Sequence, residues 1–331
     1  MTTPFPLLRL PKLELIPVLQ QMEPIDIIAL SLLSNRARLL TKTAGLSVTS
    51  ISILAKNRIL NIDIVQRDGK KILISLMSQN HTEFVVVFVD YYTPVWRILG
   101  FSTAELIHRI LDVTNCESIQ EVQFCETDSF DALPILATLP HIEQIYISRD
   151  CNEVFVHKMF EMLSKVISNI SMWQDRFANL EQFQKVLMLN MNSITINVMT
   201  ARDPTRVRLS LDDLLISNAV HLHLFEVMIS VKTLNRFFKL WMRKKSNPRL
   251  EHLKFMTMEN MSTDVLLKGL NAIEMPQTTT RTFRVSDHAN SRCQEKVVTG
   301  GMDVMRSDET RATLEIKVMP GISVVEFYVW M

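Results

Sequence analysis

The sequence of 331 residues contains only seven glycines and four cysteines. So little glycine leaves little material for the loops that cradle phosphates, which argues against a nucleotide-binding enzyme. The cysteines, Cys116, Cys125, Cys151 and Cys293, form no Cys-x-x-Cys pair and have no ligand-like spacing to histidine. This pattern argues against structural zinc, and low cysteine usage in a long chain fits a reducing compartment.

The chain also lacks charge of one sign and long hydrophobic runs. Thirty-six basic residues face 35 acidic ones, so no whole-chain field favours nucleic acid or anionic lipid. The longest strongly apolar run, Phe84 to Val89, is too short to span a bilayer. The N-terminus has no basic segment followed by an uninterrupted apolar stretch. We expect a soluble cytoplasmic or nuclear protein without nucleic-acid or membrane partners.

Signatures of catalysis are missing too. No Gly-x-Ser-x-Gly, His-Glu-x-x-His or Ser-x-x-Lys motif occurs, and no cysteine lies in a nucleophile signature. His221 and His223 stand two apart on a predicted strand and so share one face, as metal-binding histidines also do. The sequence offers no convincing third ligand nearby, which favours exposed strand positions. We expect no enzyme activity, no cofactor and no metal site.

What the chain does contain is apolar material, at 47% of its residues. Over residues 5–44, apolar residues recur at helical spacing in two stretches separated by Glu23 and Pro24, which predicts compact helices. Proline inside a helix clashes with the carbonyl four residues earlier, so the first full helix is expected to begin near Ile16 or Pro17. Short β-type runs and a turn at 67–70 follow over residues 47–89, and Thr103–Val113 is expected to form a helix.

One spacing recurs from residue 119 to 275: apolar, two variable, apolar, one variable, apolar. Its starts lie 23 to 31 residues apart, near the period of leucine-rich repeats, in which one strand and one helix stack per unit. A non-repeating α/β domain remains the alternative, because an apolar chain yields such triplets by chance. The occurrences are Ile119/Val122/Phe124, Ile142/Ile145/Ile147, Ile167/Ile170/Met172, Met191/Ile194/Ile196, Ala219/Leu222/Leu224 and Leu250/Leu253/Phe255.

Several segments together resemble a known family. They are Phe5–Pro11, Val18–Met22, Pro24–Ser31 and Ser34–Arg38, then Leu211–Leu215, Leu234–Trp241, Ser246–Glu251, Gly300–Val304 and Ala312–Leu314. In this order they resemble the large nematode family that joins an N-terminal F-box to a type 2 F-box-associated domain. The expected architecture is α/β: a helical F-box, then an irregular leucine-rich-repeat-like solenoid flanked by β-hairpins. Its parts are 4–44 (F-box), 45–115 (hairpin and helix), 116–275 (repeat-like substrate domain) and 276–331 (C-terminal β cap).

The resemblance implies a substrate-recognition subunit of an SCF-type cullin-RING E3 ubiquitin ligase. The F-box would dock on a Skp-type adaptor, and through it on a cullin scaffold, while the C-terminal domain would bind an unknown substrate protein. A short helical module cannot bury all of its own apolar residues and needs a partner surface to cover them, which fits this role. The expected adaptor contacts are Leu10, Pro11, Ile16, Leu19, Ile27 and Ile28. Two alternatives stay open: these residues pack on the chain itself, or the protein is a non-catalytic interaction scaffold with a vestigial F-box.

Substrate binding is expected on the sheet. In each repeat the three apolar residues would point inward, so the residues between them would face outward on the concave surface. Tyr146, Trp173 and Phe225 are the expected aromatic anchors. The expected substrate-binding residues are Tyr146, Trp173, His221, His223, Phe225, His252 and Lys254, with Asn169, Ser171, Ser193 and Thr195 among their neighbours.

Overall fold

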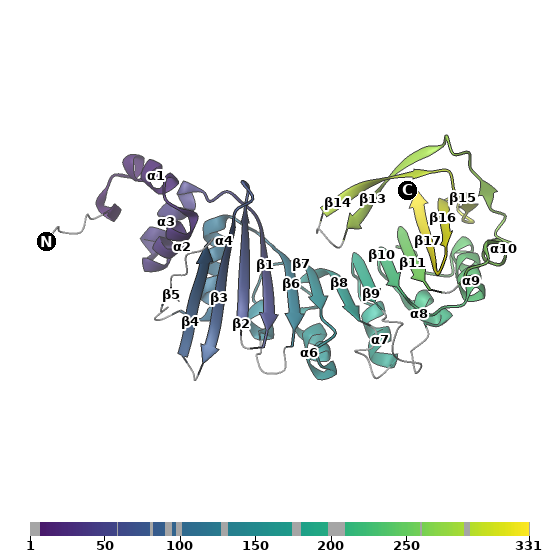
Figure 1. Ribbon diagram of the computed structural model, residues 1–331, viewed down its shortest axis with the longest axis horizontal. Helices are drawn as coiled ribbons and strands as arrows, with labels where there is room; N and C mark the ends of the chain where they lie inside the picture. Colours follow the sequence, from purple (N-terminus) through teal and green to yellow (C-terminus); the bar gives the residue numbers. More distant parts are fainter. Residues whose placement is uncertain are drawn as a thin grey trace. The chain divides into compact units, whose positions relative to one another are not determined.

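The computed structural model describes residues 7–57, 59–79, 82–89, 95–96, 101–126, 132–173, 180–197, 209–258, 260–287 and 292–330. Residues 4–6 of the expected F-box lie outside this part. The chain divides into two compact units, Met1–Glu143 and Gln144–Met331 (Figure 1). The division falls within the expected 116–275 segment.

The first unit begins with short helices. They are the 3-10 turn η1 (Leu7–Arg9), α1 (Lys12–Gln20), α2 (Pro24–Leu33) and α3 (Asn35–Ala44). Leu15 and Leu19 of α1 are buried against Ala44, with Leu10 and Met22 packed at the edge of this cluster. Helices of nine or ten residues are too short to be stable alone, so this packing holds them together.

The expected start of the first helix was wrong. α1 begins at Lys12, after Pro11, and continues through Pro17 to Gln20. Pro17 removes one backbone hydrogen bond, to the carbonyl of Leu13, whose side chain is exposed. Leu15 and Leu19 lie on either side of Pro17 and are both fully buried. Their tertiary packing therefore outweighs the local cost of the proline.

The rest of the first unit is a sheet with accompanying helices. β1 (Val48–Lys56), β2 (Ile59–Gln66), β3 (Lys71–Gln79), β4 (Thr82–Val89) and β5 (Val95–Trp96) pair antiparallel in sequence order. The turn expected at 67–70 joins β2 to β3. After α4 (Thr103–Thr114), β6 (Ile119–Cys125) pairs parallel with β1, and α5 (Leu133–Leu136) follows. The sequence-predicted strands and helix in this stretch are confirmed.

The second unit alternates strands and helices. Its parallel strands are β8 (Ile167–Trp173), β9 (Ser193–Asn197), β10 (His221–Phe225) and β11 (His252–Thr257), and β7 (Ile142–Ile147) precedes β8. The helices in this unit are α6 (Glu153–Leu163), α7 (Leu180–Leu187), α8 (Leu211–Ile216), α9 (Val231–Met242) and α10 (Thr263–Leu267).

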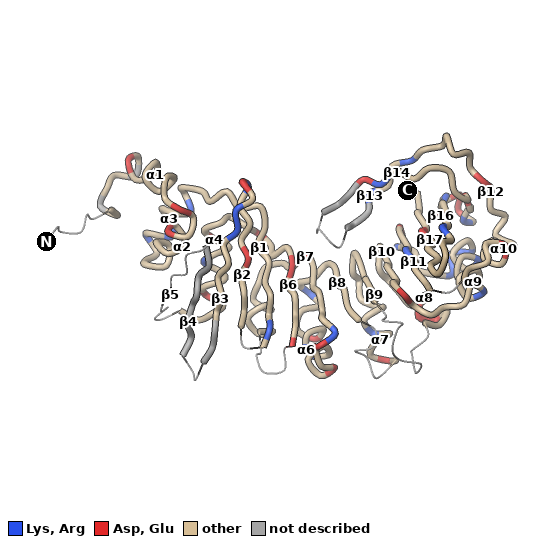
Figure 2. The backbone as a smooth tube through the Cα atoms, viewed as in Figure 1, with Lys and Arg blue, Asp and Glu red and all other residues tan. Residues whose placement is uncertain are grey.

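The C-terminal strands complete this sheet. β17 (Ile322–Trp330) pairs antiparallel with β11, and β16 (Arg311–Met319), β15 (Met302–Met305) and β12 (Ile273–Glu274) follow outward. A separate hairpin consists of β13 (Thr280–Asp287) and β14 (Arg292–Thr299). Basic and acidic residues are interspersed along most of the described chain (Figure 2), and Arg243, Lys244 and Lys245 form a short basic run after α9.

The recurring apolar triplets mark the buried side of these strands. Every residue of the six triplets is buried, and each triplet lies on a strand or begins two residues before one. In the second unit, α9 contributes to the layer on this side: Phe238 and Trp241 pack against Phe327 of β17, with ring centroids 5.0 and 4.9 Å from that of Phe327. The structure thus confirms a mixed α/β fold with an N-terminal helical region and a large sheet.

Candidate functional site

The expected adaptor contacts divide by burial. Leu19, Ile27 and Ile28 are 0%, 4% and 1% exposed. Leu19 lies in the cluster with Leu15 and Ala44, and Ile27 and Ile28 are buried on α2, which packs against α3 and α4. Leu10 and Ile16 are half-buried, and Pro11 is exposed. The first three therefore offer no surface to a partner in this conformation. Helical spacing identified which residues are apolar, but not which of them the neighbouring helices cover.

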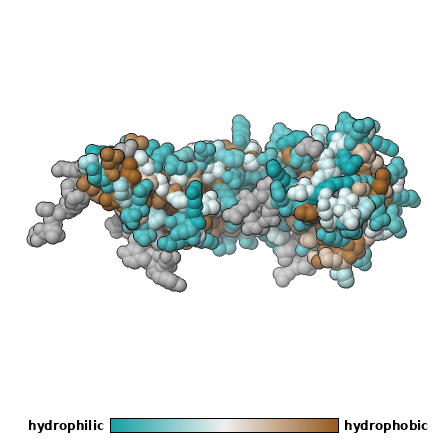
Figure 3. All heavy atoms as spheres, turned by 90° about the horizontal axis from the view of Figure 1, so that it is seen from above, coloured by the Kyte–Doolittle hydropathy of each residue, from teal (hydrophilic) through white to brown (hydrophobic). Residues whose placement is uncertain are grey.

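Other apolar residues of the helices face solvent. Leu13 and Val18 of α1 are 84% and 41% exposed, Leu33 at the end of α2 is 72% exposed, and Leu39 of α3 is 62% exposed. Hydrophobic atoms gather over these N-terminal helices, at the left of Figure 3. We call these four residues the exposed helix set. Large apolar side chains concentrated on one small module are typical of a protein-binding surface.

The expected substrate-binding residues lie in rows across the sheet of the second unit. Strand register places Asn169, Ser193, His221, His252 and Tyr328 in one row, on successive strands β8, β9, β10, β11 and β17. The next row on the same face contains Ser171, Thr195, His223, Lys254 and Glu326. Side chains alternate along a strand, so both rows lie on the face opposite the last two residues of each apolar triplet. Register therefore brings together the expected residues of β8 to β11.

The aromatic members of this set make direct contacts. Trp173 Nε1 donates a hydrogen bond to Tyr146 Oη at 3.3 Å, joining β8 to β7. Lys254 Nζ lies 5.5 Å from the centroid of the Phe225 ring, a cation–π distance. Tyr146, Trp173 and Phe225 are each partly exposed. These three side chains thus retain surface that a binding partner could contact.

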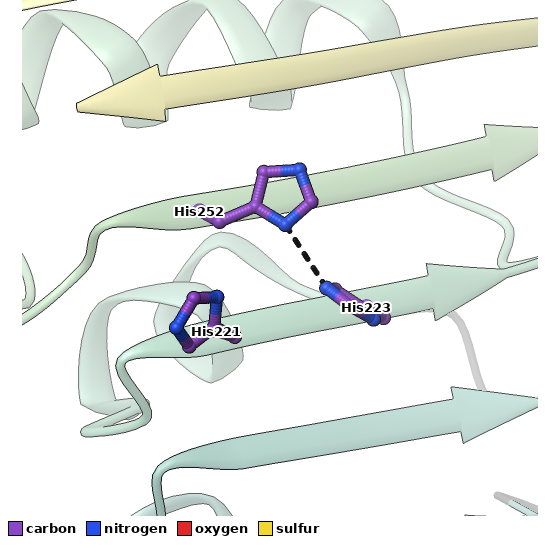
Figure 4. Close-up of side chains that lie close together, drawn as sticks. All are labelled: His221, His223 and His252. Atoms are coloured by element: carbon purple, nitrogen blue, oxygen red, sulfur yellow. Dashed lines mark hydrogen bonds between the residues drawn. The ribbon is translucent and has the colours of Figure 1, made fainter. Parts of the chain in front are cut away.

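The histidines are more enclosed. His223 Nε2 and His252 Nδ1 are hydrogen-bonded at 3.0 Å, and His221 lies beside them on β10 (Figure 4). His223 is 3% exposed, His252 is 1% exposed and His221 is partly buried. Burial lowers the pKa of His252 to about 3 and also lowers the pKa of His221, because a protonated imidazole loses its hydration there. Two of the expected contact residues, His223 and His252, are therefore largely covered.

The β13–β14 hairpin supplies part of that cover. Phe283 of β13 packs against His252 and Tyr328, with ring centroids 5.6 and 5.2 Å apart, and His252 stacks on Tyr328 at 5.0 Å. Lys296 of β14 forms an ion pair with Glu326 of β17. Burial raises the pKa of Glu326, but Lys296 and Tyr328 outweigh that effect and hold this pKa at about 2. Glu326 is thus an anion fixed close to the histidines.

Two segments of the chain match known protein families, one in the N-terminal helices and one in the sheet of the second unit. The F-box domain matches residues 7–47, which include η1 and α1 to α3. The F-box-associated family matches residues 182–255, which contain β9, β10 and most of α7 and β11. The chain combines an F-box with an F-box-associated domain. This is the domain order that the sequence segments indicated. No curated protein and no solved structure matches the chain.

The two matched segments contain most of the candidate residues. The exposed helix set lies in the F-box, while His221, His223, His252 and Lys254 lie in the F-box-associated segment. Tyr146 and Trp173 precede that segment. Sequence reasoning did not find Tyr328 and Glu326, which pair with His252 and Lys254 of β11 across 76 and 72 residues of sequence. It also missed Phe283, which packs on His252 from the β13–β14 hairpin. No helix in the described part of the chain is both long and apolar enough to cross a membrane.

Proposed function

We propose that the protein is a substrate adaptor of an SCF-type cullin-RING ubiquitin ligase. The observation that supports this is the F-box match over residues 7–47, together with the exposed helix set on those same helices. F-box domains generally bind Skp-type adaptors. The chain would then carry no chemistry: the cullin scaffold and its RING partner, reached through the Skp-type adaptor, would deliver ubiquitin in the cytoplasm or nucleus.

The helix surface is where this docking is proposed. Leu33 and Leu39 lie near the α2–α3 junction and expose most of their side chains. Burying an exposed leucine fully contributes about 1.5–3 kcal/mol, so a few such residues can dominate a small interface. Pro11, Leu10 and Ile16 are proposed as lesser contacts, because Leu10 and Ile16 are already half-buried. Leu19, Ile27 and Ile28 would act indirectly, by holding the helices in place.

Substrate binding is proposed on the sheet of the second unit. Its parallel strands β8 to β11, with intervening helices and fully buried apolar triplets, support a leucine-rich-repeat-like arrangement. The partly exposed Tyr146, Trp173 and Phe225 would be the principal contacts, because aromatic side chains bury large areas at little entropic cost. Lys254 would lie at the edge of that surface.

Adaptor binding can be tested by co-expressing the full chain with a Skp-type adaptor and measuring co-purification. Leu33→Glu with Leu39→Glu should abolish the complex while leaving the thermal unfolding midpoint close to that of wild type, because both side chains are exposed. Charged substitutions at Leu19 or Ile28 would instead unfold the helices and would not isolate binding. Val154→Glu is a matched control, since Val154 is 79% exposed on α6 of the other unit.

The outcomes distinguish two functions. Loss of the complex in the double variant, but not in the Val154→Glu control, supports the ligase adaptor. If the wild-type chain binds no Skp-type adaptor, the protein is better described as an interaction scaffold with a vestigial F-box. Substrate binding has its own readout: proteins that co-purify with wild type should be lost from Tyr146→Ala with Trp173→Ala, and their retention would contradict the sheet surface.

A further inference from the structure

Strand pairing brings three histidines into one cluster. His221 and His252 are direct register partners on β10 and β11, and His223 lies two residues after His221 on the same face. One ring nitrogen from each residue lies within 4.8 Å of the other two. Figure 4 shows the three rings turned toward a common space on this face of the sheet. The third ligand that the sequence did not reveal is thus His252, 29 residues beyond His223.

The cluster contains ring nitrogens with no hydrogen-bond partner. His252 Nε2 and His221 Nδ1 are buried and make no hydrogen bond among the described residues. His252 is 1% exposed, so solvent does not satisfy it. A buried polar atom left unpaired destabilises the fold. A ligand bound at His221 Nδ1 would explain why that atom is retained, whereas His252 Nε2 would carry the ring proton when His252 Nδ1 coordinates.

The tautomers of the cluster can suit a metal ion. A neutral imidazole coordinates a metal through the ring nitrogen that carries no proton. The hydrogen-bonded nitrogens of His223 and His252 can both face a metal if one ring changes its neutral tautomer.

We propose that His221, His223 and His252 bind one divalent transition-metal ion of the class that prefers imidazole, such as Zn²⁺. Three histidines with a fourth position for water form a known tetrahedral set for this class. Zn–N distances of about 2.0–2.1 Å place ligand nitrogens about 3.3 Å apart. His223 and His252 already approach that separation, at 3.0 Å. Closing the site needs a rotation of His221, the least buried of the three.

The surroundings are compatible with a cation. Glu326 acts electrostatically on His252, and its carboxylate forms ion pairs with Lys296 and Lys254. Those pairs offset the repulsion that the lysines would otherwise exert on a metal ion. Tyr328 and Phe283 pack against the His252 ring and fix its orientation. The metal site does not depend on the ligase function, because it uses no residue of the F-box.

The test is a metal titration of the purified full chain after chelator treatment. Co²⁺ is added while visible absorption is recorded, since tetrahedral Co²⁺ with nitrogen ligands has an intense spectrum, and Zn²⁺ is then added to displace it. We expect one equivalent bound with micromolar or tighter affinity. His221→Gln, His223→Gln and His252→Gln should each weaken binding about 100-fold or more, since loss of even an outer partner costs about 10–100-fold.

His157→Gln is the matched control. His157 lies on α6 with half of its side chain exposed, and its partner is the solvent-exposed Glu161 one turn later on the same helix. It should bind Co²⁺ as tightly as wild type. If His252→Gln fails to fold, His221→Gln decides the question, because its side chain is partly exposed. The proposal would be overturned if the wild-type chain bound no Co²⁺ at micromolar concentration, or if the three histidine variants bound Co²⁺ as tightly as wild type. His223 and His252 would then be a buried hydrogen-bonded pair without a metal.

Discussion

The guanidinium of Arg281 donates one hydrogen bond to each carboxylate oxygen of Asp303, both at 2.8 Å. Arg281 also donates to Thr313 Oγ1 at 2.7 Å, and Thr313 in turn donates to Asp303 at 2.6 Å. These contacts tie the β13–β14 hairpin to β15 and β16. The β13–β14 hairpin, which covers part of the histidine cluster, is therefore held in place partly by the bidentate ion pair between Arg281 and Asp303.

Arg281→Met should lower the free energy of unfolding by about 2–3 kcal/mol, because it removes the hydrogen-bonded charged partner of the nearly buried Asp303 carboxylate and leaves the more distant Arg311 at 3.8 Å. Arg284→Met on the same strand is the control. Arg284 is 80% exposed and 4.0 Å from Glu295, so its loss should change stability by less than about 0.5 kcal/mol. Urea unfolding of both variants measures the difference. Equal effects would show that the Arg281 ion pair does not hold the hairpin.

Acid should weaken the same contact. Burial raises the pKa of Asp303, but the hydrogen bonds from Arg281 and Thr313 outweigh it and hold this pKa below the ordinary 3.8. The unfolded chain therefore binds more protons as pH falls below about 4, and the stability from Asp303 is lost over that range. Urea unfolding between pH 3 and 6 should show a shallower pH dependence in Asp303→Asn than in wild type. Glu326 accounts for part of the remaining slope, and parallel curves would contradict this assignment.

Gly301→Ala should destabilise the second unit by about 1–3 kcal/mol. Gly301 has a φ of +90°, and an added Cβ would lie 2.6 Å from Thr313 Cγ2 and 3.0 Å from the Leu314 carbonyl oxygen. Gly321→Ala separates the two causes, because Gly321 has a φ of +79° but open space around it. Thermal unfolding should therefore show a larger loss for Gly301→Ala. An equal loss would mean that backbone conformation alone matters.

Ser102→Ala should lower stability by about 1 kcal/mol, the usual cost of losing an N-cap. Ser102 Oγ accepts a hydrogen bond from the Glu105 backbone amide at 3.3 Å, and Glu105 Oε2 accepts one from the Ser102 amide at 2.8 Å. Thr103→Ala, one position later, leaves both capping bonds in place and is the control. Hydrogen exchange should report faster opening of the first turn of α4 in Ser102→Ala only. Unchanged exchange would contradict the capping role.

Much of the architecture follows from the order of apolar residues. The six triplets predicted the strands β6 to β11 because a strand alternates its side chains between two faces, and a buried face must be apolar. The turn at 67–70 and the helix α4 follow from equally local signals. The ordered F-box and F-box-associated segments also identified the domain architecture, since several short patterns in one order are more specific than any one of them.

The tertiary structure alone decided which apolar residues of the F-box helices are covered, and which side chains meet across strands. Leu19, Ile27 and Ile28 have the same local spacing as exposed neighbours, but packing of their helices against neighbouring helices buries them. Pro17 is tolerated inside α1 because Leu15 and Leu19 are anchored on both sides of it. His252 joins His221 and His223 only through the register of β10 and β11, a pairing between residues far apart in sequence that local patterns do not encode.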